Sequence, residues 1–236
     1  MITYRSSATV FRDFESKLHE IASSPEIHTV LDIGGGCNPA IDPPDVKKYS
    51  LSYSLLDIER TELEKAPSGY DKICADICSS DLQLEHSYDF VFSMMLAEHV
   101  SDAMQFHRNV FKTLTPGGVA LHLFPTLYTL PFLVNKFTPE RLAKRILDAV
   151  LHREQHSHTK FPAYYHWCRG PISKQITRLQ NIGYRIEEYR GYYGHQVYYL
   201  KLPMLRQLHE WKSEWLVKHP LPLFTSYAIL LLRKPK

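Results

Sequence analysis

Several patterns are missing from this sequence, and each absence excludes a class of protein. The cysteines form no Cys-x-x-Cys pair and show no secreted-domain spacing, so we expect reduced thiols rather than a disulfide framework. No apolar run reaches the roughly 18 residues that a membrane-spanning helix needs, and the first residues lack the long apolar core of a signal peptide. A formal net charge of +3 is too small for the clustered positive charge that nucleic acid requires. We therefore expect a cytoplasmic protein with no stable membrane span and no nucleic-acid partner.

What is present is an alternation of strands and helices. The 236 residues, 44% of them hydrophobic, suffice for one domain with a packed core. Five apolar runs in the first half of the chain are separated by short helical patterns, and they cover residues 29–33, 53–57, 70–77, 88–93 and 119–124. Strands that alternate with helices pair in parallel and are covered on both faces. The sequence therefore predicts an α/β protein with a doubly wound sheet.

The most informative stretch is the turn after the first of these runs, where Asp32 is followed by Gly34, Gly35 and Gly36. An acid and three glycines describe a sharp turn whose backbone a ligand can approach closely. A dinucleotide fingerprint would need its third glycine at Pro39, and no Gly-Lys-Ser or Gly-Lys-Thr of a P-loop follows. An adenosine that carries positive charge and no phosphate, such as S-adenosylmethionine, suits this turn better. An NAD-dependent oxidoreductase shares the same kind of crevice and stays an alternative.

Five motifs in order carry a resemblance to a known family. They are Val30-Leu31-Asp32-Ile33-Gly34-Gly35-Gly36, Leu56-Asp57, Ala75-Asp76-Ile77, Asp89-Phe90-Val91-Phe92-Ser93 and Leu114-Thr115-Pro116-Gly117-Gly118. Together they resemble the ordered motifs of class I S-adenosylmethionine-dependent methyltransferases, over about residues 27–124. The triplet Glu98-His99-Val100 is similar to the small-molecule branch of that family, whereas Asn38 stands where the family often has a third glycine.

The resemblance implies a Rossmann-like methyltransferase fold, a mostly parallel seven-stranded sheet with a helical lid inserted after the fifth strand. We divide this single domain into an N-terminal helical leader (1–26), a cofactor-binding core (27–124), a helical lid or substrate insertion (125–170), and the end of the sheet (171–236) with an inserted helix at about 203–218. The leader is predicted because Val10, Phe14 and Leu18 recur at helical spacing.

By the same resemblance, S-adenosyl-L-methionine is the cofactor and S-adenosyl-L-homocysteine its product. Asp57 would accept hydrogen bonds from both ribose hydroxyls, and Asp76 one from the adenine amino group, with Ile77 on the ring. Asp32 would orient the glycine loop and favour the ammonium. The implied cofactor-binding residues are Asp32, Gly34, Gly35, Gly36, Asp57, Ile58, Asp76, Ile77, Ser93 and Met94, the last two near the sulfonium.

The expected acceptor is a small polar molecule, such as a sugar or a natural-product intermediate, methylated at a hydroxyl or at an amine. A hydroxyl needs a general base, and a histidine suits that role. The candidate catalytic residues are His99, His166 and His195. No metal is expected, because the spacing of His152, His156 and His158 matches no known ligand pattern.

Three further alternatives stay open at this point. One is an N-methyltransferase that acts on a small amine. Another is a nucleic-acid methyltransferase, although Ser93-Met94-Met95-Leu96 stands where such enzymes commonly have Asn-Pro-Pro-Tyr. A third is a non-catalytic Rossmann-like binding module. Lid aromatics such as Tyr128, Phe132 and Phe161 are equally consistent with an acceptor pocket or with the core of the insertion, and the oligomeric state is open.

Overall fold

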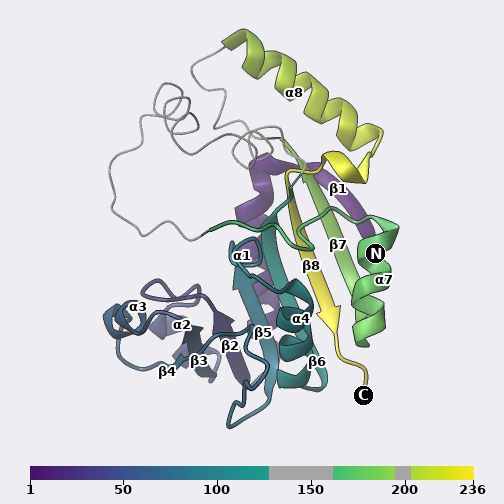
Figure 1. Ribbon diagram of the computed structural model, residues 1–236. Helices are drawn as coiled ribbons and strands as arrows, with labels where there is room; N and C mark the ends of the chain where they lie inside the picture. The colour runs from purple at the N-terminus through teal and green to yellow at the C-terminus, as the bar shows by residue number, and fades with distance from the viewer. Residues whose placement is uncertain (128–161, 195–202) are drawn as a thin grey trace.

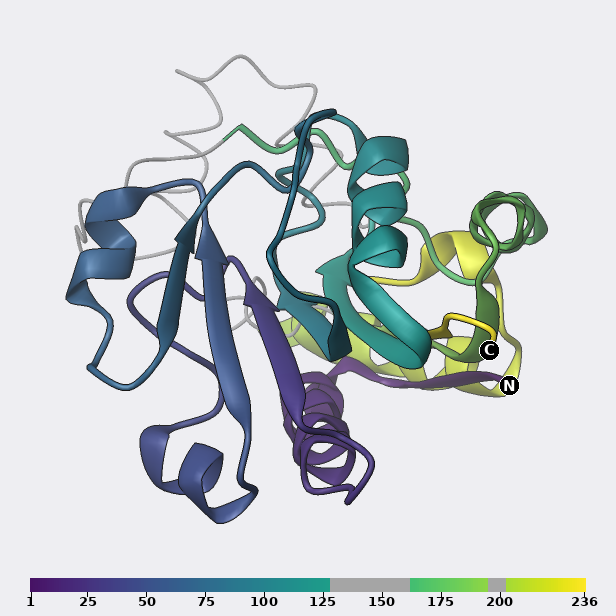
Figure 2. The same cartoon turned by 90° about the horizontal axis from the view of Figure 1, so that it is seen from below.

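The protein is built on one sheet with helices on both faces (Figures 1 and 2). The computed structural model describes residues 1–127, 162–194 and 203–236. The strands are β1 (Ile2–Ser6), β2 (Thr29–Ile33), β3 (Ser52–Asp57), β4 (Asp71–Cys74), β5 (Tyr88–Met94), β6 (Leu114–Pro125), β7 (Arg185–Tyr193) and β8 (Tyr227–Arg233). The helices are α1 (Val10–Ala22), α2 (Pro43–Lys48), α3 (Arg60–Lys65), α4 (Ala103–Thr113), α7 (Ser173–Ile182) and α8 (Pro203–Lys218), with 3₁₀ turns η1 (Ser7–Thr9) and η3 (Pro222–Phe224). Among these described helices, none is both long and apolar enough to cross a membrane.

The strand order confirms the predicted doubly wound α/β architecture. It runs β1-β7-β8-β6-β5-β2-β3-β4, and every pair is parallel except those that β8 makes with β6 and β7. Strand β2 lies between β3 and β5, with Ile33 opposite both Leu56 and Ser93. The chain order therefore reverses at β2, and in open α/β sheets ligands bind beyond the carboxyl ends of the strands at such a reversal.

Helix α1 packs its apolar side, which repeats every four residues, against one face of the sheet. Val10, Phe14, Leu18 and Ala22 recur every four residues, and all four are buried in the core on one face of the sheet. The ring of Phe14 meets that of Phe92 edge-on at 6.5 Å between centroids. Helix α4 covers the opposite face, as Figure 2 shows, so both faces of the central strands are buried.

Among the described residues the sheet has eight strands rather than the predicted seven, because the leader is not wholly helical. Its first residues form β1, which pairs in parallel with β7 from Ile2 opposite Tyr189 to Ser6 opposite Tyr193. A five-residue strand at the edge of a sheet leaves almost no periodic signal in its own sequence. Its pairing partner lies far along the chain, so local reasoning could not find it.

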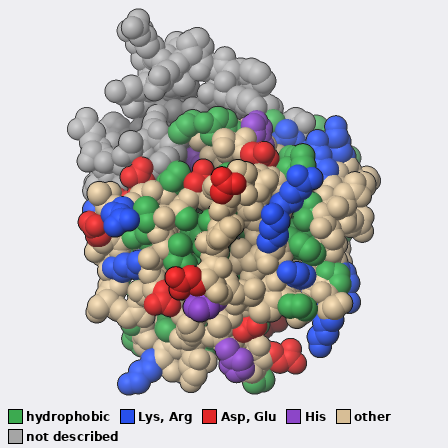
Figure 3. Space-filling model, turned by 60° about the horizontal axis from the view of Figure 1, so that its bottom comes forward, with side chains coloured by type: hydrophobic (Ala, Val, Ile, Leu, Met, Phe, Trp, Pro, Cys, Tyr) green, Lys and Arg blue, Asp and Glu red, His purple; other side chains and the backbone are tan. Residues whose placement is uncertain are grey.

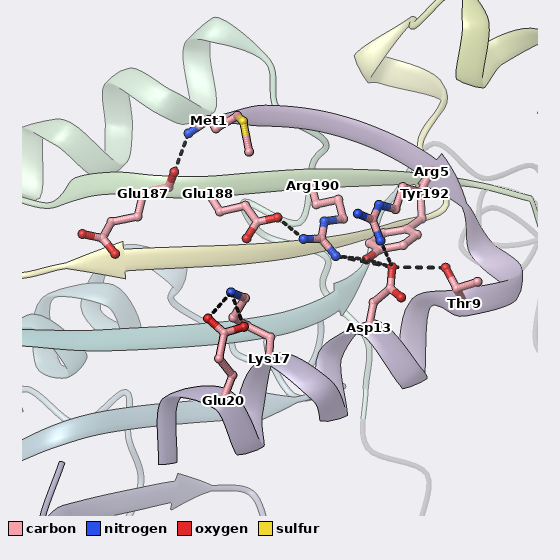
Figure 4. Close-up of polar contacts among 10 residues, drawn as sticks. All are labelled: Met1, Arg5, Thr9, Asp13, Lys17, Glu20, Glu187, Glu188, Arg190 and Tyr192. Carbon is pink, nitrogen blue, oxygen red and sulfur yellow. Dashed lines mark hydrogen bonds and ion pairs between the residues drawn. The ribbon is translucent and has the colours of Figure 1, made fainter. Parts of the chain in front are cut away.

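Asp13 on α1 ties this extra strand to the sheet (Figure 4). Its carboxylate accepts hydrogen bonds from Arg5 (3.0 Å), Thr9 (3.1 Å) and Tyr192 (3.0 Å), and Arg190 adds an ion pair at 3.3 Å. Partial burial alone would raise the pKa of Asp13, but the hydrogen bonds from Tyr192, Thr9 and Arg5 hold it below its usual value. One carboxylate thus joins β1, α1 and β7.

Several predictions fall outside the described residues. They are the part of the predicted helical lid at residues 128–161, the lid aromatics Tyr128, Phe132 and Phe161, the histidines His152, His156 and His158, and the candidate base His195.

Candidate active site

The candidate site lies at the carboxyl edge of the sheet, where β2, β3, β4 and β5 end beside one another. Gly34 continues β2, and its amide donates a 2.7 Å hydrogen bond to the carbonyl of Leu56 on β3. The amide of Ala75, just after β4, donates to the carbonyl of Asp57 at 3.0 Å. The register therefore brings the predicted residues of these strands to one edge.

The glycine loop needs its glycines. Gly34 has φ of +80° and Gly36 has φ of +47°, both in the left-handed region that side chains disfavour. A Cβ on Gly34 would stand 2.7 Å from the Cδ1 of Leu96, and a Cβ on Gly36 would stand 3.2 Å from Oδ2 of Asp57. The loop backbone thus passes close to the Asp57 carboxylate, with no side chain between them.

Asp32 holds this loop from inside the fold. Its Oδ2 accepts hydrogen bonds from the Tyr53 hydroxyl at 2.9 Å and the Ala40 amide at 3.2 Å. A Cβ on Gly35 would stand 2.6 Å from the same oxygen, so the loop lies directly on the carboxylate. Burial raises the pKa of Asp32 to about 7, against the opposing hydrogen bonds from Ala40 and Tyr53. These contacts are those of a residue that orients the loop; an effect on the ammonium stays a prediction.

Asp57 and Ile58 end β3 at the surface of the site. Oδ1 of Asp57 accepts a 2.9 Å hydrogen bond from the amide of Glu59, while Oδ2 is the oxygen that faces Gly36. Ile58 is 57% exposed, so its side chain offers an apolar surface beside the carboxylate.

Asp76 and Ile77 follow β4. Asp76 is exposed, and its Oδ1 accepts a 2.7 Å hydrogen bond from the amide of Cys78. Ile77 is buried in the core that α4 covers, and the side-chain amide of Asn109 bonds the carbonyls of Ile77 and Ser79, both at 2.7 Å. This turn is fixed from α4, with the carboxylate of Asp76 on its outer side.

Ser93 and Met94 end β5 in different environments. Met94 is 43% exposed, but Ser93 is fully buried, and its hydroxyl lies 2.8 Å from Nδ1 of His122, its direct neighbour on β6. Burial lowers the pKa of His122 to about 3, so that ring is neutral. The His122 ring also meets that of His107 on α4 at 5.6 Å. No sequence pattern predicted this buried histidine pair, and His122 occupies the hydroxyl of Ser93, which was expected near the sulfonium.

Two of the predicted histidines come together at a junction, which we define as residues 98–101 bonded to residues 162–168. The carbonyl of Glu98 accepts hydrogen bonds from the amides of Tyr164 (2.7 Å) and Tyr165 (3.0 Å). Nδ1 of His99 lies 3.0 Å from the carbonyl of Pro162, and Nδ1 of His166 lies 2.8 Å from the carbonyl of Ser101. A carbonyl oxygen only accepts, so Nδ1 donates in each ring. In the neutral rings, Nε2 is then the basic nitrogen.

Glu98 is the residue of this junction that the sequence did not predict as a site residue. Its carboxyl group is buried, Oε1 lies 3.8 Å from Nε2 of His99, and Oε2 has no hydrogen-bond partner among the described residues. Burial raises the pKa of Glu98 to about 8. The available signal was an acid between the apolar pair Leu96-Ala97 and Val100, which predicts a buried carboxyl. Within the described ranges, no three His, Cys, Asp or Glu side chains are placed to hold a metal ion.

Comparison with known proteins agrees with this geometry. Residues 31–122, which include most of the site, match the family model described as a methyltransferase domain. A search of curated proteins found no match.

Solved structures share the fold at low identity. An S-adenosylmethionine-dependent methyltransferase from Mesorhizobium loti is 16% identical, with a TM-score of 0.54 over 93% of this chain and 98% of its own. Phosphoethanolamine N-methyltransferase 2 of Haemonchus contortus, in complex with S-adenosyl-L-methionine, is 14% identical with a TM-score of 0.58, over 96% of this chain and 53% of its own. The plantazolicin methyltransferase BpumL, in complex with a pentazolic substrate analogue and S-adenosylhomocysteine, is 12% identical with a TM-score of 0.56, over 97% of this chain and 85% of its own.

The family match and the shared fold support a class I S-adenosylmethionine-dependent methyltransferase. Residues 31–122 thus match a methyltransferase domain, and the chain shares its fold with S-adenosylmethionine-dependent methyltransferases.

Proposed function

We propose that this enzyme transfers the methyl group of S-adenosylmethionine to a hydroxyl of a small polar molecule. The observation that carries the proposal is the junction, where His99 and His166 are both anchored through Nδ1 next to the loop that follows β5. An anchored ring with its basic nitrogen on the other side is what a general base requires. His195, which lies outside the described residues, stays a third candidate for this role.

The cofactor-binding part of the proposal assigns each side chain a task that its position supports. The backbone of Gly36 lies so close to Asp57 that a Cβ there would stand 3.2 Å from Oδ2, so the glycine loop and this carboxylate border the same edge of the sheet. We assign the ribose hydroxyls to Asp57, with Ile58 beside it, and the adenine to Asp76 and Ile77. The glycine backbones approach the methionine part, with Asp32 beneath them. We assign Met94, with the buried Ser93 next to it in the chain, to the region of the sulfonium.

The bound cofactor supplies a sulfonium that is both methyl donor and leaving group, so the protein mainly has to position the acceptor, exclude water and take up a proton. As the new O–CH₃ bond forms and the S–CH₃ bond breaks, leaving a neutral thioether, Nε2 of His99 or His166 would take the proton that the hydroxyl loses. The carbonyls of Pro162 and Ser101 hold the two rings in place. Oε1 of Glu98 lies 3.8 Å from Nε2 of His99, so the buried carboxyl group faces the nitrogen that would take up the proton.

Methylation of a small amine is the second candidate. The relative from Haemonchus contortus is an N-methyltransferase, and an amine that has lost its proton needs no base. The two reactions differ in their need for a histidine.

We also propose a cytoplasmic location and no nucleic-acid substrate. A formal net charge of only +3 does not favour phosphate-backbone binding. On the face shown in Figure 3, basic side chains lie mainly toward the right, and acidic side chains lie mainly in the centre and on the left.

Thermal unfolding with S-adenosylmethionine or S-adenosylhomocysteine tests the cofactor assignment. Ligand at about 100 times its dissociation constant should stabilise the protein by roughly 2.7 kcal/mol. Asp57→Ala should abolish the shift, whereas the control Asp71→Asn, an exposed acid at the opposite end of neighbouring β4, should retain it. An unchanged shift in Asp57→Ala would refute the ribose assignment.

Turnover with methyl-labelled cofactor and a panel of small hydroxyl and amine compounds tests the acceptor. For a hydroxyl acceptor, at least one of His99→Ala, His166→Ala and His195→Ala should lose about 10²- to 10⁴-fold in turnover. If all three keep normal turnover at saturating cofactor, histidine base catalysis is wrong.

A further inference from the structure

Helix α8 displays its apolar side to solvent. Met204, Leu208, Trp211 and Trp215 are 85%, 60%, 65% and 45% exposed. At about 100° per residue these four side chains fall within a sector of roughly 60° on one side of the helix, which we call the α8 stripe. A helix of a globular protein normally turns such a stripe toward the core. Here the arrangement is inverted.

The opposite side of α8 faces the protein. Ser213 and Leu216 are buried, and α8 lies across the ends of β1 and β7. Figure 1 shows the helix standing at this end of the sheet, apart from the helices that cover its faces. Apolar surface continues beyond the helix with Leu221, Leu223 and Phe224, which are all about half exposed.

Basic side chains flank the stripe, whereas the acids of α8 lie away from it, with Arg206 paired to Glu210 on the far side. Lys212, Lys218 and His219 are exposed and lie within about 70° of its centre. The acids of the helix, Glu210 and Glu214, lie about 90° or more from it. Both acids line a cavity of about 290 Å³ between α8 and the ends of β1 and β7. The outer side of α8 is therefore apolar at its centre and basic at its rim.

We propose that α8 docks this enzyme on an anionic membrane surface. Tryptophan and leucine side chains at the level of the lipid headgroups, flanked by lysines over acidic lipid, are the features of a helix that lies in the interface rather than crossing it. The proposal is independent of the methylation reaction.

A second copy of the chain fits the stripe less well. The 16 residues of α8 make a helix only about 24 Å long, and one stripe of that length buries far less than the roughly 800 Å² per partner of a stable interface. A two-fold helix pair centred near Trp211 would also bring two copies of Lys212 together.

Co-sedimentation with vesicles tests the proposal. The whole protein should bind vesicles of phosphatidylcholine with about one-third phosphatidylserine, and bind pure phosphatidylcholine at least tenfold more weakly. Raised salt should weaken the binding to anionic vesicles. Lys212→Gln with Lys218→Gln should lower the partition coefficient roughly 20- to 30-fold, at about fivefold for each lysine.

Trp211→Glu with Trp215→Glu should abolish vesicle binding, since it places charge in the centre of the stripe. The matched control is Met104→Glu, an apolar side chain of α4 that is 42% exposed; it should bind like the parent protein. Circular dichroism and the thermal shift with S-adenosylhomocysteine verify that each variant is folded. The proposal would be overturned if the protein did not bind anionic vesicles, or if the tryptophan variant bound them as well as the parent protein. It would also be overturned if the parent protein were a dimer that bound no vesicles and the tryptophan variant were a monomer.

Discussion

Replacing Asp32 by asparagine should change how the stability of this protein depends on pH. The carboxyl group of Asp32 is 3% exposed, and its pKa is raised from 3.8 to about 7, chiefly by burial. Asparagine has nearly the same shape, and its carbonyl oxygen can accept the hydrogen bonds of Tyr53 and Ala40 that Oδ2 now accepts. The variant therefore removes the ionisation and little else.

The sign follows from the raised pKa. Below about pH 4 the group is protonated in both the folded and the unfolded chain, so its contribution to stability is complete. As the pH rises toward 7 the unfolded chain releases the proton while the folded chain keeps it, and stability falls by about 1.4 kcal/mol per pH unit. Above about pH 7 the loss is complete. Between pH 5 and pH 8 the difference in the free energy of unfolding between wild type and Asp32→Asn should thus move by about 3 kcal/mol in favour of the variant.

Urea unfolding at pH 5, 6, 7 and 8 measures this difference for both proteins. Other titrating groups contribute equally to both curves and cancel. Asp71→Asn, an exposed acid, is the control and should follow the wild-type curve. If the curves of wild type and Asp32→Asn run parallel across this range, Asp32 is not a buried carboxyl with a raised pKa, and the account of the loop given above fails.

Three further predictions concern the same edge of the sheet. Burial raises the pKa of Glu98 to about 8, so the ionisation of this group also lowers the stability of the wild type as the pH rises from about 5 to 8. In urea unfolding, Glu98→Gln should therefore lose less stability than the wild type over this range. An equally steep loss in the variant would contradict this. Gly34→Ala forces a side chain to φ of +80° and against Leu96, and should cost about 1–2 kcal/mol in unfolding free energy and weaken the thermal shift with S-adenosylhomocysteine. Ser93→Ala leaves His122 without its hydroxyl partner and should lower stability by about 1–3 kcal/mol, measured by calorimetry, with a change under about 0.5 kcal/mol counting against a buried hydrogen bond.

Local sequence could predict the parts of this fold that local physics determines. Strands β2, β3, β5 and β6 contain apolar runs, and burial on both faces requires such runs. Gly34 and Gly36 are also predictable from local physics. Their positive φ angles lie in the left-handed region, which glycine adopts at little cost and other residues do not.

Contacts between distant segments could not be predicted in this way. Strand β1 exists because β7 offers an edge, and neither its five residues nor their spacing encode that partner. The position of Ser93 depends on which face of β5 it shares with Val91, and its partner His122 comes from another strand. Glu98 and the two anchored histidines depend on residues 162–168 returning to the end of β5.

The two hydrogen bonds that the Glu98 carbonyl accepts also link the glycine loop to residues 162–168. Leu96 rests over Gly34, and two residues later the same loop holds the amides of Tyr164 and Tyr165. A molecule that displaces Leu96 from the glycine loop therefore pulls on the backbone that carries residues 162–168. Such coupling is reciprocal, so a molecule bound against those residues alters the affinity at the glycine loop by the same factor. An acceptor affinity measured without donor should accordingly differ from the one that operates with donor bound.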